Sequence, residues 1–542
     1  MPLVDQFYKG KVNYYINTHE QNCGHAATGY AKSSNKMGVV ISTSGPGITN
    51  LVTPMLDAQT DGVPLLVLSG QVGTDFIGTG AFQEAPAAEI TRPVTKMSYC
   101  IKEVNQLPGM LDYAIDLIQR DRPGVVHLDL PKNVLVNKYH YRENLDKTVY
   151  ELSNEDSIED SKIVRAADAI NRSVNPIFFL GKGCSPNIDK LVEKTQIPFT
   201  TTIHSKGIIT EEHPLSLEWC GMHGSAAANF ALQKADCIIG IGARFDDRTT
   251  GLLDKYAPNG KNIINVNIDS QSFGKTVNSN HNIVMDSSNF INQIYPLLDN
   301  FIPTKEWINE INNLRKKNPF KYNIPKGGKL NTPMAISMLN KLTLGKPTIF
   351  TTGVGNHQMM AYQFIKGDYP GKIHSSGSLG VMGAGLPYAI GAQIANPDKL
   401  VVNIDGDSSF LMTMSDMKTI VENNLPVKIA IMNDSRQMMV NIWERLFFEG
   451  RYTATINKRN PSFRDVAEGF GIKGLICENS DELEDVSREF LETDGPCLCE
   501  YKVEPEICLP LVGPGKALDE MILFDEYHKN QDISFDKNFI PS

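Results

Sequence analysis

Short apolar segments rich in β-branched residues recur along the chain, and many of them run directly into a loop that contains glycine. They lie at 39–41, 65–68, 125–130, 177–180, 238–241, 263–268, 348–350, 400–404 and 427–432. Helical patterns separate several of them, as where Leu111, Ala114, Ile115 and Ile118 recur at the spacing of one helix face. Strands that alternate with helices form parallel sheets, which bind ligands at the carboxyl ends of their strands. The pattern therefore predicts α/β domains with a site among the glycine loops.

The length of 542 residues fits three or four domains at about 150 residues each. Two polar stretches, 139–162 and 319–332, have the composition of linkers. We therefore expect three doubly wound parallel-sheet domains, at 1–140, 160–320 and 332–510, followed by a tail at 511–542.

Composition excludes several classes of protein. Hydrophobic residues make up 41% and charged residues 21%, which is typical of a globular chain, and no apolar run reaches the length of about 18 residues that a membrane span needs. The net charge is −10 and there is no basic run, so we expect neither nucleic acid nor membrane as a partner. The first residues have neither an apolar signal core nor an Arg/Ser-rich transit region, so we expect a cytoplasmic protein, with an organelle as the alternative.

The cysteines indicate a reducing compartment. Nine of them are spread along the chain without the spacing of a disulfide framework. Cys497 and Cys499 would share one face of a strand, but no second pair is present to complete a metal site.

Carboxylates follow two apolar segments of the third expected domain. Asp407 comes after 400–404, and Asn433 and Asp434 come after 427–432. The two aspartates are 27 residues apart, about the length of one β–α–β crossover, which would place the two strand ends side by side. Two carboxylates and a main-chain carbonyl can hold Mg²⁺, with phosphate oxygens and water at its other positions. An acidic turn with a helix cap is the alternative.

This pair of segments resembles the Gly-Asp-Gly … Asn-Asn signature of thiamine-diphosphate enzymes, and its surroundings resemble the catalytic subunit of the acetohydroxyacid synthase family. The resemblance runs from residue 1 to about 525. It implies a pyrimidine-binding domain, a central FAD-binding domain and a domain that binds diphosphate and Mg²⁺. The segments that carry it are 19–21, 43–47, 81–84, 122–124, 221–224, 242–248, 353–358, 380–382 and 505–521.

The resemblance implies roles for residues of the first and third domains. Glu20 follows a strand-like segment at 14–17, so we expect its carboxyl at the edge of a sheet. By the resemblance it would be catalytic, pairing with the aminopyrimidine ring of thiamine diphosphate. Met382 would be the apolar wedge that bends the cofactor, and the Gly380 carbonyl would hold its amino group. Asp407 and Asp434 would bind Mg²⁺ through side chains and Arg436 through its main-chain oxygen. Further cofactor contacts would come from Gly355, Asn356, His357, Gly406, Ser408 and Met439.

Three of these residues also have an interpretation that involves no cofactor. An isolated Glu20 would be a solvated charge, Met382 a core residue and His357 a structural histidine. The family context reverses this interpretation for Glu20.

For the central domain, the resemblance implies FAD. No Gly-x-Gly-x-x-Gly fingerprint is present, so FAD rests on the resemblance alone, and in this family the flavin has no redox role in the reaction. The residues implied to contact it are Arg122, His223, Arg244, Asp269 and Asp286.

The second 2-ketoacid would meet Arg248, whose guanidinium matches a carboxylate, and Trp443, whose indole limits the alkyl group. Phe82 and Gln83 would belong to the same channel. A surface ion pair and a core tryptophan are the alternatives for Arg248 and Trp443.

The implied activity is acetolactate synthesis from pyruvate and a second 2-ketoacid, pyruvate or 2-oxobutanoate, as the first common step of branched-chain amino-acid biosynthesis. The implied assembly is a homodimer or homotetramer, with a regulatory small subunit as a further partner. Another carboligase or oxidase of the same superfamily is one alternative, and a catalytically weak cofactor-binding homologue is the second.

Several positions depart from the family pattern. Asp434 stands for the second Asn, Ser408 for Gly or Ala, and Asn356 for Gln. Met438 stands where Gly is usual, and Ile442 where Gln is usual. The chain also begins at a point that matches the family just after its first Gly-Gly loop. This departure is the reason for the second alternative, a catalytically weak cofactor-binding homologue.

Overall fold

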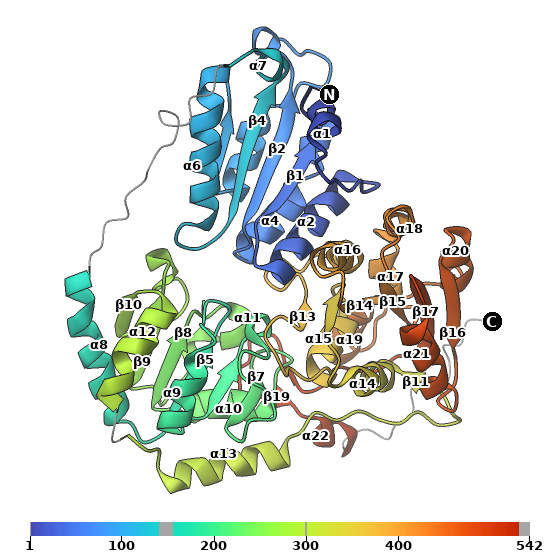
Figure 1. Cartoon of the computed structure of the whole chain (residues 1–542). Coiled ribbons are helices and arrows are strands. Elements are labelled where there is room, and N and C mark those ends of the chain that lie inside the picture. The colour runs from blue at the N-terminus through green and yellow to red at the C-terminus, as the bar shows by residue number, and fades with distance from the viewer. Residues whose placement is uncertain (1, 140–155, 299–300, 530–542) are drawn as a thin grey trace.

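Three parallel sheets follow one another along the chain, as the computed structural model in Figure 1 shows. The structure describes residues 2–139, 156–298 and 301–529. Helices pack on each sheet, and each sheet with its helices is called a unit below: first, central and third. The predicted α/β class with three parallel-sheet domains is confirmed.

The first unit has the strand order β1-β2-β4-β3, with all pairs parallel. The central strand β4 is buried along its whole length, as expected for a strand covered on both faces. The strands are β1 Gly38–Ser42, β2 Leu65–Gln71, β3 Met97–Cys100 and β4 Val125–Pro131. The helices are α1 Pro2–Gly10, α2 Glu20–Ser34, α3 Pro46–Thr49, α4 Val52–Thr60, α5 Ala87–Thr91, α6 Leu107–Gln119 and α7 Lys132–Val136.

The strand-like segment expected before Glu20 is not a strand. Residues 14–17 form no ladder, and the side chains of Tyr14 and Ile16 are 59% and 63% exposed. The chain that follows is held by a side chain of the third unit instead. Asn17 Nδ2 and Thr18 N donate to the carboxylate of Asp416 at 2.8 and 2.9 Å.

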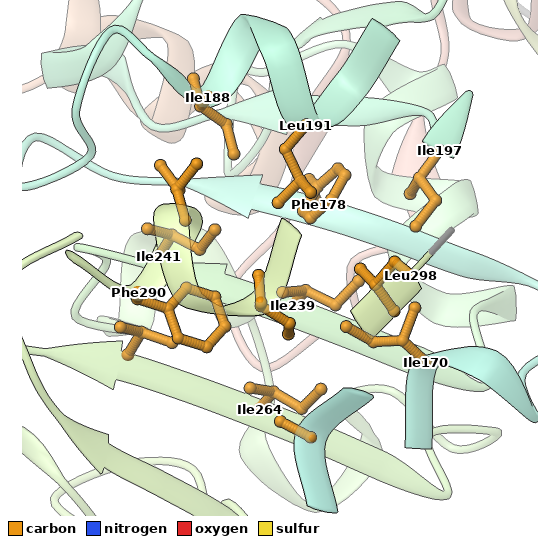
Figure 2. Close-up of a cluster of buried hydrophobic side chains, with 14 of the residues drawn as sticks. Ile170, Phe178, Ile188, Leu191, Ile197, Ile239, Ile241, Ile264, Phe290 and Leu298 are labelled. Carbon is orange, nitrogen blue, oxygen red and sulfur yellow. The ribbon is translucent and has the colours of Figure 1, made fainter. Parts of the chain in front are cut away.

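The central unit has the strand order β10-β9-β8-β5-β6-β7. Figure 2 shows one side of its core, where Phe178, Ile239 and Ile264 from neighbouring strands meet Phe290 and Leu191 from two helices. The strands are β5 Pro176–Leu180, β6 Phe199–Thr201, β7 Ser216–Trp219, β8 Cys237–Ile241, β9 Asn262–Asn267 and β10 His281–Val284. The helices are α8 Asp156–Asn171, α9 Ile188–Thr195, α10 Ala226–Lys234, α11 Asp247–Thr250, α12 Ser287–Ile294 and α13 Lys305–Lys317.

The third unit has the strand order β11-β17-β15-β14-β12-β13, with β16 on the other side of β17. The strands are β11 Leu330–Asn331, β12 Thr348–Thr352, β13 Ile373–His374, β14 Leu400–Gly406, β15 Lys428–Asn433, β16 Lys473–Cys477 and β17 Cys497–Glu504. The helices are α14 Thr332–Thr343, α15 Asn356–Phe364, α16 Gly385–Ala395, α17 Asp407–Phe410, α18 Met417–Glu422, α19 Met438–Phe447, α20 Phe463–Gly469 and α21 Leu483–Glu492.

Both expected linkers are shorter than predicted. Of the first, residues 140–155 lie outside the described residues, and α8 already begins at Asp156. The second ends early because Leu330 and Asn331 pair with the end of β17. The residues between, 318–328, form neither helix nor strand.

The described part of the tail is more buried than its polar composition indicates. It contains β18 Leu511–Val512, the antiparallel β19 Met521–Ile522 and α22 Phe524–Lys529. Val512, Leu518 and Met521 belong to a core cluster of the central unit. The tail therefore returns from the third unit and packs against the central one.

The described cysteines are all free, and Cys497 and Cys499 are buried in β17. Among the described residues, no group of three or more His, Cys, Asp or Glu could hold a metal ion. Within the same ranges, no helix is long and apolar enough to cross a membrane.

Helices α2 and α16 join the first and third units, and they lie against each other in Figure 1. Glycines allow this close approach. A Cβ on Gly391 would lie 1.8 Å from the Ala26 carbonyl oxygen, and a Cβ on Gly29 would lie 2.4 Å from the Tyr388 carbonyl oxygen. Main chain meets main chain at both points, so neither neighbour can move aside easily.

Gly391→Ala should therefore destabilise the protein by about 3 kcal/mol or more, because an added methyl group must push two helices apart. Gly469→Ala is the matched control, since this glycine ends α20 and a Cβ there meets nothing within 4 Å. Urea unfolding of the two variants and the parent measures the difference. A loss no larger for Gly391→Ala than for Gly469→Ala would show that the two helices do not depend on this contact.

Candidate active site

Three strands of the third unit end side by side and deliver polar residues to one edge of the sheet. β14 lies between β12 and β15, and all three are parallel. β12 leads to the loop before Asn356, while β14 and β15 lead directly to Asp407 and Asp434. This is the crossover arrangement predicted from the spacing of the two aspartates.

A cavity lies at this edge of the sheet. It brings together ten of the residues predicted to bind cofactor or metal: Gly355, Asn356, His357, Met382, Gly406, Asp407, Ser408, Asp434, Arg436 and Met439. Gly380 is not among the lining residues, although it lies two residues before Met382. Prediction missed Ser409, Gln437 and Val440, which also line the cavity.

The surroundings of the two aspartates in the cavity disfavour their charged forms. Burial raises the pKa of Asp407, and burial together with the charge of Asp407 raises the pKa of Asp434 well above its usual range. A divalent cation bound by both carboxylates would stabilise their charged forms and so oppose these shifts. The residues therefore fit Mg²⁺, with Asp407 and Asp434 as its carboxylate ligands.

Asp407 is held by two amides that the sequence did not single out. Asn457 Nδ2 and Asn460 Nδ2 donate to its Oδ2 at 2.8 and 2.6 Å. Asn460 also donates to Asn433 Oδ1 at 3.0 Å. These bonds orient the carboxylate. The sequence signal that could have indicated them is the pair of asparagines at 457 and 460.

A close contact between the end of β14 and the start of α15 explains why Gly406 is a glycine. A Cβ on Gly406 would lie 2.8 Å from His357 Nδ1, so the imidazole fits only against a bare main chain. His357 Nε2 lies 3.4 Å from Asp405 Oδ1. Asn356 Nδ2 donates to the Glu506 carbonyl at 2.9 Å, and its buried Oδ1 receives no hydrogen bond from the described residues. A ligand donor would satisfy that oxygen.

Glu20 lies outside this cavity. It is the first residue of α2, half-buried, and its carboxylate accepts from Asn50 Nδ2 at 3.0 Å. Among the residues described as lining the cavity, none belongs to the first unit. The structure of one chain therefore does not bring the predicted catalytic acid to the predicted metal site.

A second cavity brings Arg248 and Trp443 together, as predicted for a substrate pocket. It measures about 520 Å³, ample for a small 2-ketoacid. Met222 and the tail segment 512–516 also line it. The tail was not predicted to contribute to a site.

Phe82 and Gln83 lie elsewhere, on a loop wrapped around the carboxylate of Glu84. Main-chain N–H groups within residues 78–81 donate to that carboxylate, at 2.8 Å from Gly80 and 3.1 Å from Ala81. These bonds lower the pKa of Glu84. The side chain of Phe82 is 90% exposed, so the loop presents an aromatic ring to the outside of the chain.

Glu84→Ala should loosen this loop, because it removes the shared acceptor of its N–H groups. We expect chymotrypsin to cleave after Phe76 or Phe82 about tenfold faster, with the global free energy of unfolding changed by less than about 0.5 kcal/mol. Glu89→Ala, an exposed glutamate five residues on, is the control. Equal cleavage rates in the two variants would remove Glu84 from the support of the loop.

Two of the predicted flavin contacts meet at the end of α4, where the first and central units are in contact. Arg122 and Arg244 both donate to the Thr60 carbonyl at the end of α4, and Lys182 Nζ donates to the Asp61 and Gly62 carbonyls at 2.7 and 3.1 Å. Three cations thus converge on one helix end. They fit the diphosphate of a dinucleotide such as FAD, and Lys182 was not predicted.

The other predicted flavin contacts have structural partners in this chain. Asp269 accepts from Gln271 N, and Asp286 begins α12 by accepting from Ser288 N at 2.9 Å. His223 is buried, and its neighbour in the sequence, Met222, lines the second cavity. The structure leaves the flavin roles of these three residues as predictions.

Comparisons with known proteins agree with the geometry. The chain matches models described as the thiamine pyrophosphate enzyme N-terminal TPP binding domain over residues 1–90, central domain over 163–294 and C-terminal TPP binding domain over 353–501. It therefore belongs to the thiamine pyrophosphate enzymes. Within them it belongs to the acetolactate synthase family, and the resemblance seen in the sequence is confirmed.

Three relatives illustrate this membership. The mitochondrial acetolactate synthase catalytic subunit of Saccharomyces cerevisiae is 40% identical, over 97% of this chain and 80% of its own length. The mitochondrial acetolactate synthase of Schizosaccharomyces pombe is 38% identical, over 97% and 83%. The probable acetolactate synthase large subunit of Methanococcus aeolicus is 36% identical, over 98% and 92%. Because two of these names include a mitochondrial location, the expected cytoplasmic location is not confirmed.

Proposed function

We propose that this protein is an acetolactate synthase, which decarboxylates pyruvate and joins the remaining two carbons to pyruvate or 2-oxobutanoate. The observation that carries this proposal is that one helix, α19, lines both cavities. Met438, Met439 and Val440 line the cavity with the two aspartates, and Trp443 lines the cavity with Arg248. A cofactor in the first cavity and a ketoacid in the second would be neighbours.

Thiamine diphosphate supplies an electron sink for the decarboxylation when it is bound. In the proposal Asp407, Asp434 and the main-chain oxygen of Arg436 hold Mg²⁺ against its diphosphate, and Met382 supports its ring system with Gly380. Glu20 holds a proton at the pyrimidine end. The remaining contacts are assigned to Gly355, Asn356, His357, Gly406, Ser408 and Met439.

Arg248 is assigned to the carboxylate of the second ketoacid. Its side chain is 63% exposed and lines the second cavity, where Nη1 lies 3.4 Å from Met222 Sδ. Its Nε lies 3.9 Å from the exposed Asp247 carboxylate, a long surface contact that a ketoacid carboxylate can replace with a bidentate pair. Trp443 fills part of the same cavity and limits the alkyl group. Phe82 and Gln83 complete the channel from a second chain.

The proposed assembly is a homodimer or homotetramer in which Glu20 of one chain faces the aspartates of another. Two observations support it: Glu20 does not line the cavity of its own chain, and the ring of Phe82 is 90% exposed. The names "catalytic subunit" and "large subunit" of the relatives support a regulatory small subunit as a further partner. The proposed domains are residues 1–140 for the pyrimidine, 160–320 for FAD and 332–510 for diphosphate and Mg²⁺, with 511–542 as a tail.

FAD is assigned to the cluster of cationic side chains at the end of α4. Arg122, Arg244 and Lys182 would hold its diphosphate, with His223, Asp269 and Asp286 as the further contacts predicted from the sequence. The flavin would have a structural role. It therefore does not change the reaction class, which is transfer of an aldehyde unit.

Pyruvate turnover by the purified full-length chain tests the function. Acetolactate should form only when thiamine diphosphate and Mg²⁺ are both present. Another ligation product in its place, such as acetoin, would indicate another carboligase, and acetate would indicate an oxidase. Turnover that stays near the uncatalysed rate, while the cofactor binds, would indicate a weak cofactor-binding homologue.

Glu20→Gln should lower acetolactate formation by about 10²-fold or more, because the shape is kept and the carboxylate is lost. Thiamine diphosphate affinity should change little, which calorimetry can measure. Glu89→Gln, an exposed glutamate of the same unit, is the control. Activity within about threefold of the parent would remove Glu20 from the mechanism.

Trp443→Leu should enlarge the pocket for the second ketoacid, so that the extra methylene group of 2-oxobutanoate loses its apolar contact with the indole and the advantage of this acceptor over pyruvate falls. With pyruvate and 2-oxobutanoate in competition, we expect the product ratio to shift towards acetolactate by about tenfold, while total pyruvate consumption changes less. Trp307→Phe, a change at a buried tryptophan of the central core that is not among the lining residues of either cavity, is the control. An unchanged product ratio would place Trp443 outside the acceptor site.

A further inference from the structure

The segment that brings Met382 to the cofactor cavity is anchored at both ends. On its C-terminal side, Gly383 N donates to Ser409 Oγ at 2.9 Å, and the Gly383 carbonyl accepts from Thr413 Oγ1 at 2.8 Å. These anchors belong to the third unit itself. The N-terminal anchor is of a different kind.

Ser376 provides that anchor through one buried hydroxyl group. Its Oγ accepts from Gly380 N at 3.1 Å and from Val381 N at 2.9 Å. The same hydroxyl donates its proton to Asp57 Oδ1 at 2.5 Å. Every hydrogen-bonding position of this hydroxyl is therefore used, and the proton points away from the segment that the oxygen holds.

Asp57 lies on α4 in the first unit, and its carboxylate is fully buried. Its second oxygen accepts from the Tyr388 hydroxyl and lies 3.3 Å from His25 Nδ1. A carboxylate acceptor strengthens the hydrogen bond of the hydroxyl that donates to it. The position of the Met382 segment thus depends on a charge in another unit of the same chain.

We propose that Ser376, tethered to Asp57, is a positioning residue that fixes the segment 380–382 for thiamine diphosphate. This inference rests on the proposed placement of the cofactor against Met382. Neither Ser376 nor Asp57 lines the cavity, so both act through the main chain of Gly380 and Val381. The first unit would then contribute to the cofactor site of its own chain, in addition to any contribution across a dimer.

Ser375 is a matched control beside it. Both serines are buried to 1% exposure. Ser375 Oγ bonds to the Tyr362 hydroxyl at 3.0 Å and, within the part of the chain that the structure describes, makes no hydrogen bond to the segment 380–382. Ser375→Ala therefore removes a buried hydroxyl of the same kind without freeing the N–H groups of Gly380 and Val381.

The test measures thiamine diphosphate affinity by calorimetry at saturating Mg²⁺, with the full-length protein. Ser376→Ala should bind about tenfold more weakly and should also lose about tenfold in kcat at saturating cofactor, because two N–H groups lose their acceptor and Met382 shifts. Ser375→Ala should stay within about twofold of the parent in both. Ser376→Thr, which keeps the hydroxyl, should recover most of the affinity, with Ser375→Thr as the control for the added methyl group.

Equal affinities for Ser376→Ala and the parent would overturn the proposal, and so would an equal loss in Ser375→Ala. If Ser376→Ala does not fold, Asp57→Asn replaces it, and unchanged cofactor affinity in that variant would overturn the proposal as well. Affinity is measured without turnover. A parent protein that binds thiamine diphosphate but makes no acetolactate would therefore contradict the proposed function and leave this inference testable.

Discussion

Two buried carboxylates on one face of α4 hold the three units of the chain together. Asp57 and Asp61 are four residues apart, and both side chains are excluded from solvent. Asp61 pairs with Lys32 of the first unit at 2.6 Å and with His204 of the central unit at 3.3 Å, and it accepts from main-chain N–H groups of 377–378 in the third. A buried carboxylate without partners costs several kcal/mol. The three units must therefore stay in the arrangement that supplies these partners.

The end of the same helix explains why the central unit meets the first where it does. The last carbonyls of a helix carry a partial negative charge, and Arg122, Arg244 and Lys182 all donate to carbonyls of residues 60–62. The carboxylates of Asp61 and Asp246 lie near the same cations, with Asp246 at 3.7 Å from Arg244. The three cationic side chains suit an anionic cofactor, and α4 supports both this cluster of cations and, through Asp57, the segment before Met382.

Sequence patterns predicted the parts of the site that depend on strand order. Asp407 and Asp434 meet because a crossover of 27 residues brings parallel strand ends together, which local rules describe well. Asn457, Asn460 and Ser376 were missed because they come from loops whose positions depend on tertiary packing. The same reason explains the wrong expectation of a strand at 14–17. The aromatic and β-branched residues there are typical of a strand, but the side chain of Asp416, and no neighbouring strand, receives the hydrogen bonds of Asn17 and Thr18.

The geometry of α19 couples the two cavities more tightly than their separate linings indicate. Met439 and Trp443 are four residues apart, so they lie on the same face of the helix about 6 Å apart along its axis. Any shift of α19 that widens the pocket around Trp443 also moves Met439 and Val440 in the cofactor cavity. Ile442 lies between them in the sequence and is fully buried. It packs in one cluster with Leu509 and Leu511, so the start of the tail supports α19. Selectivity for the second ketoacid and support of the cofactor are thus properties of one packed helix, and the tail that holds it takes part in both.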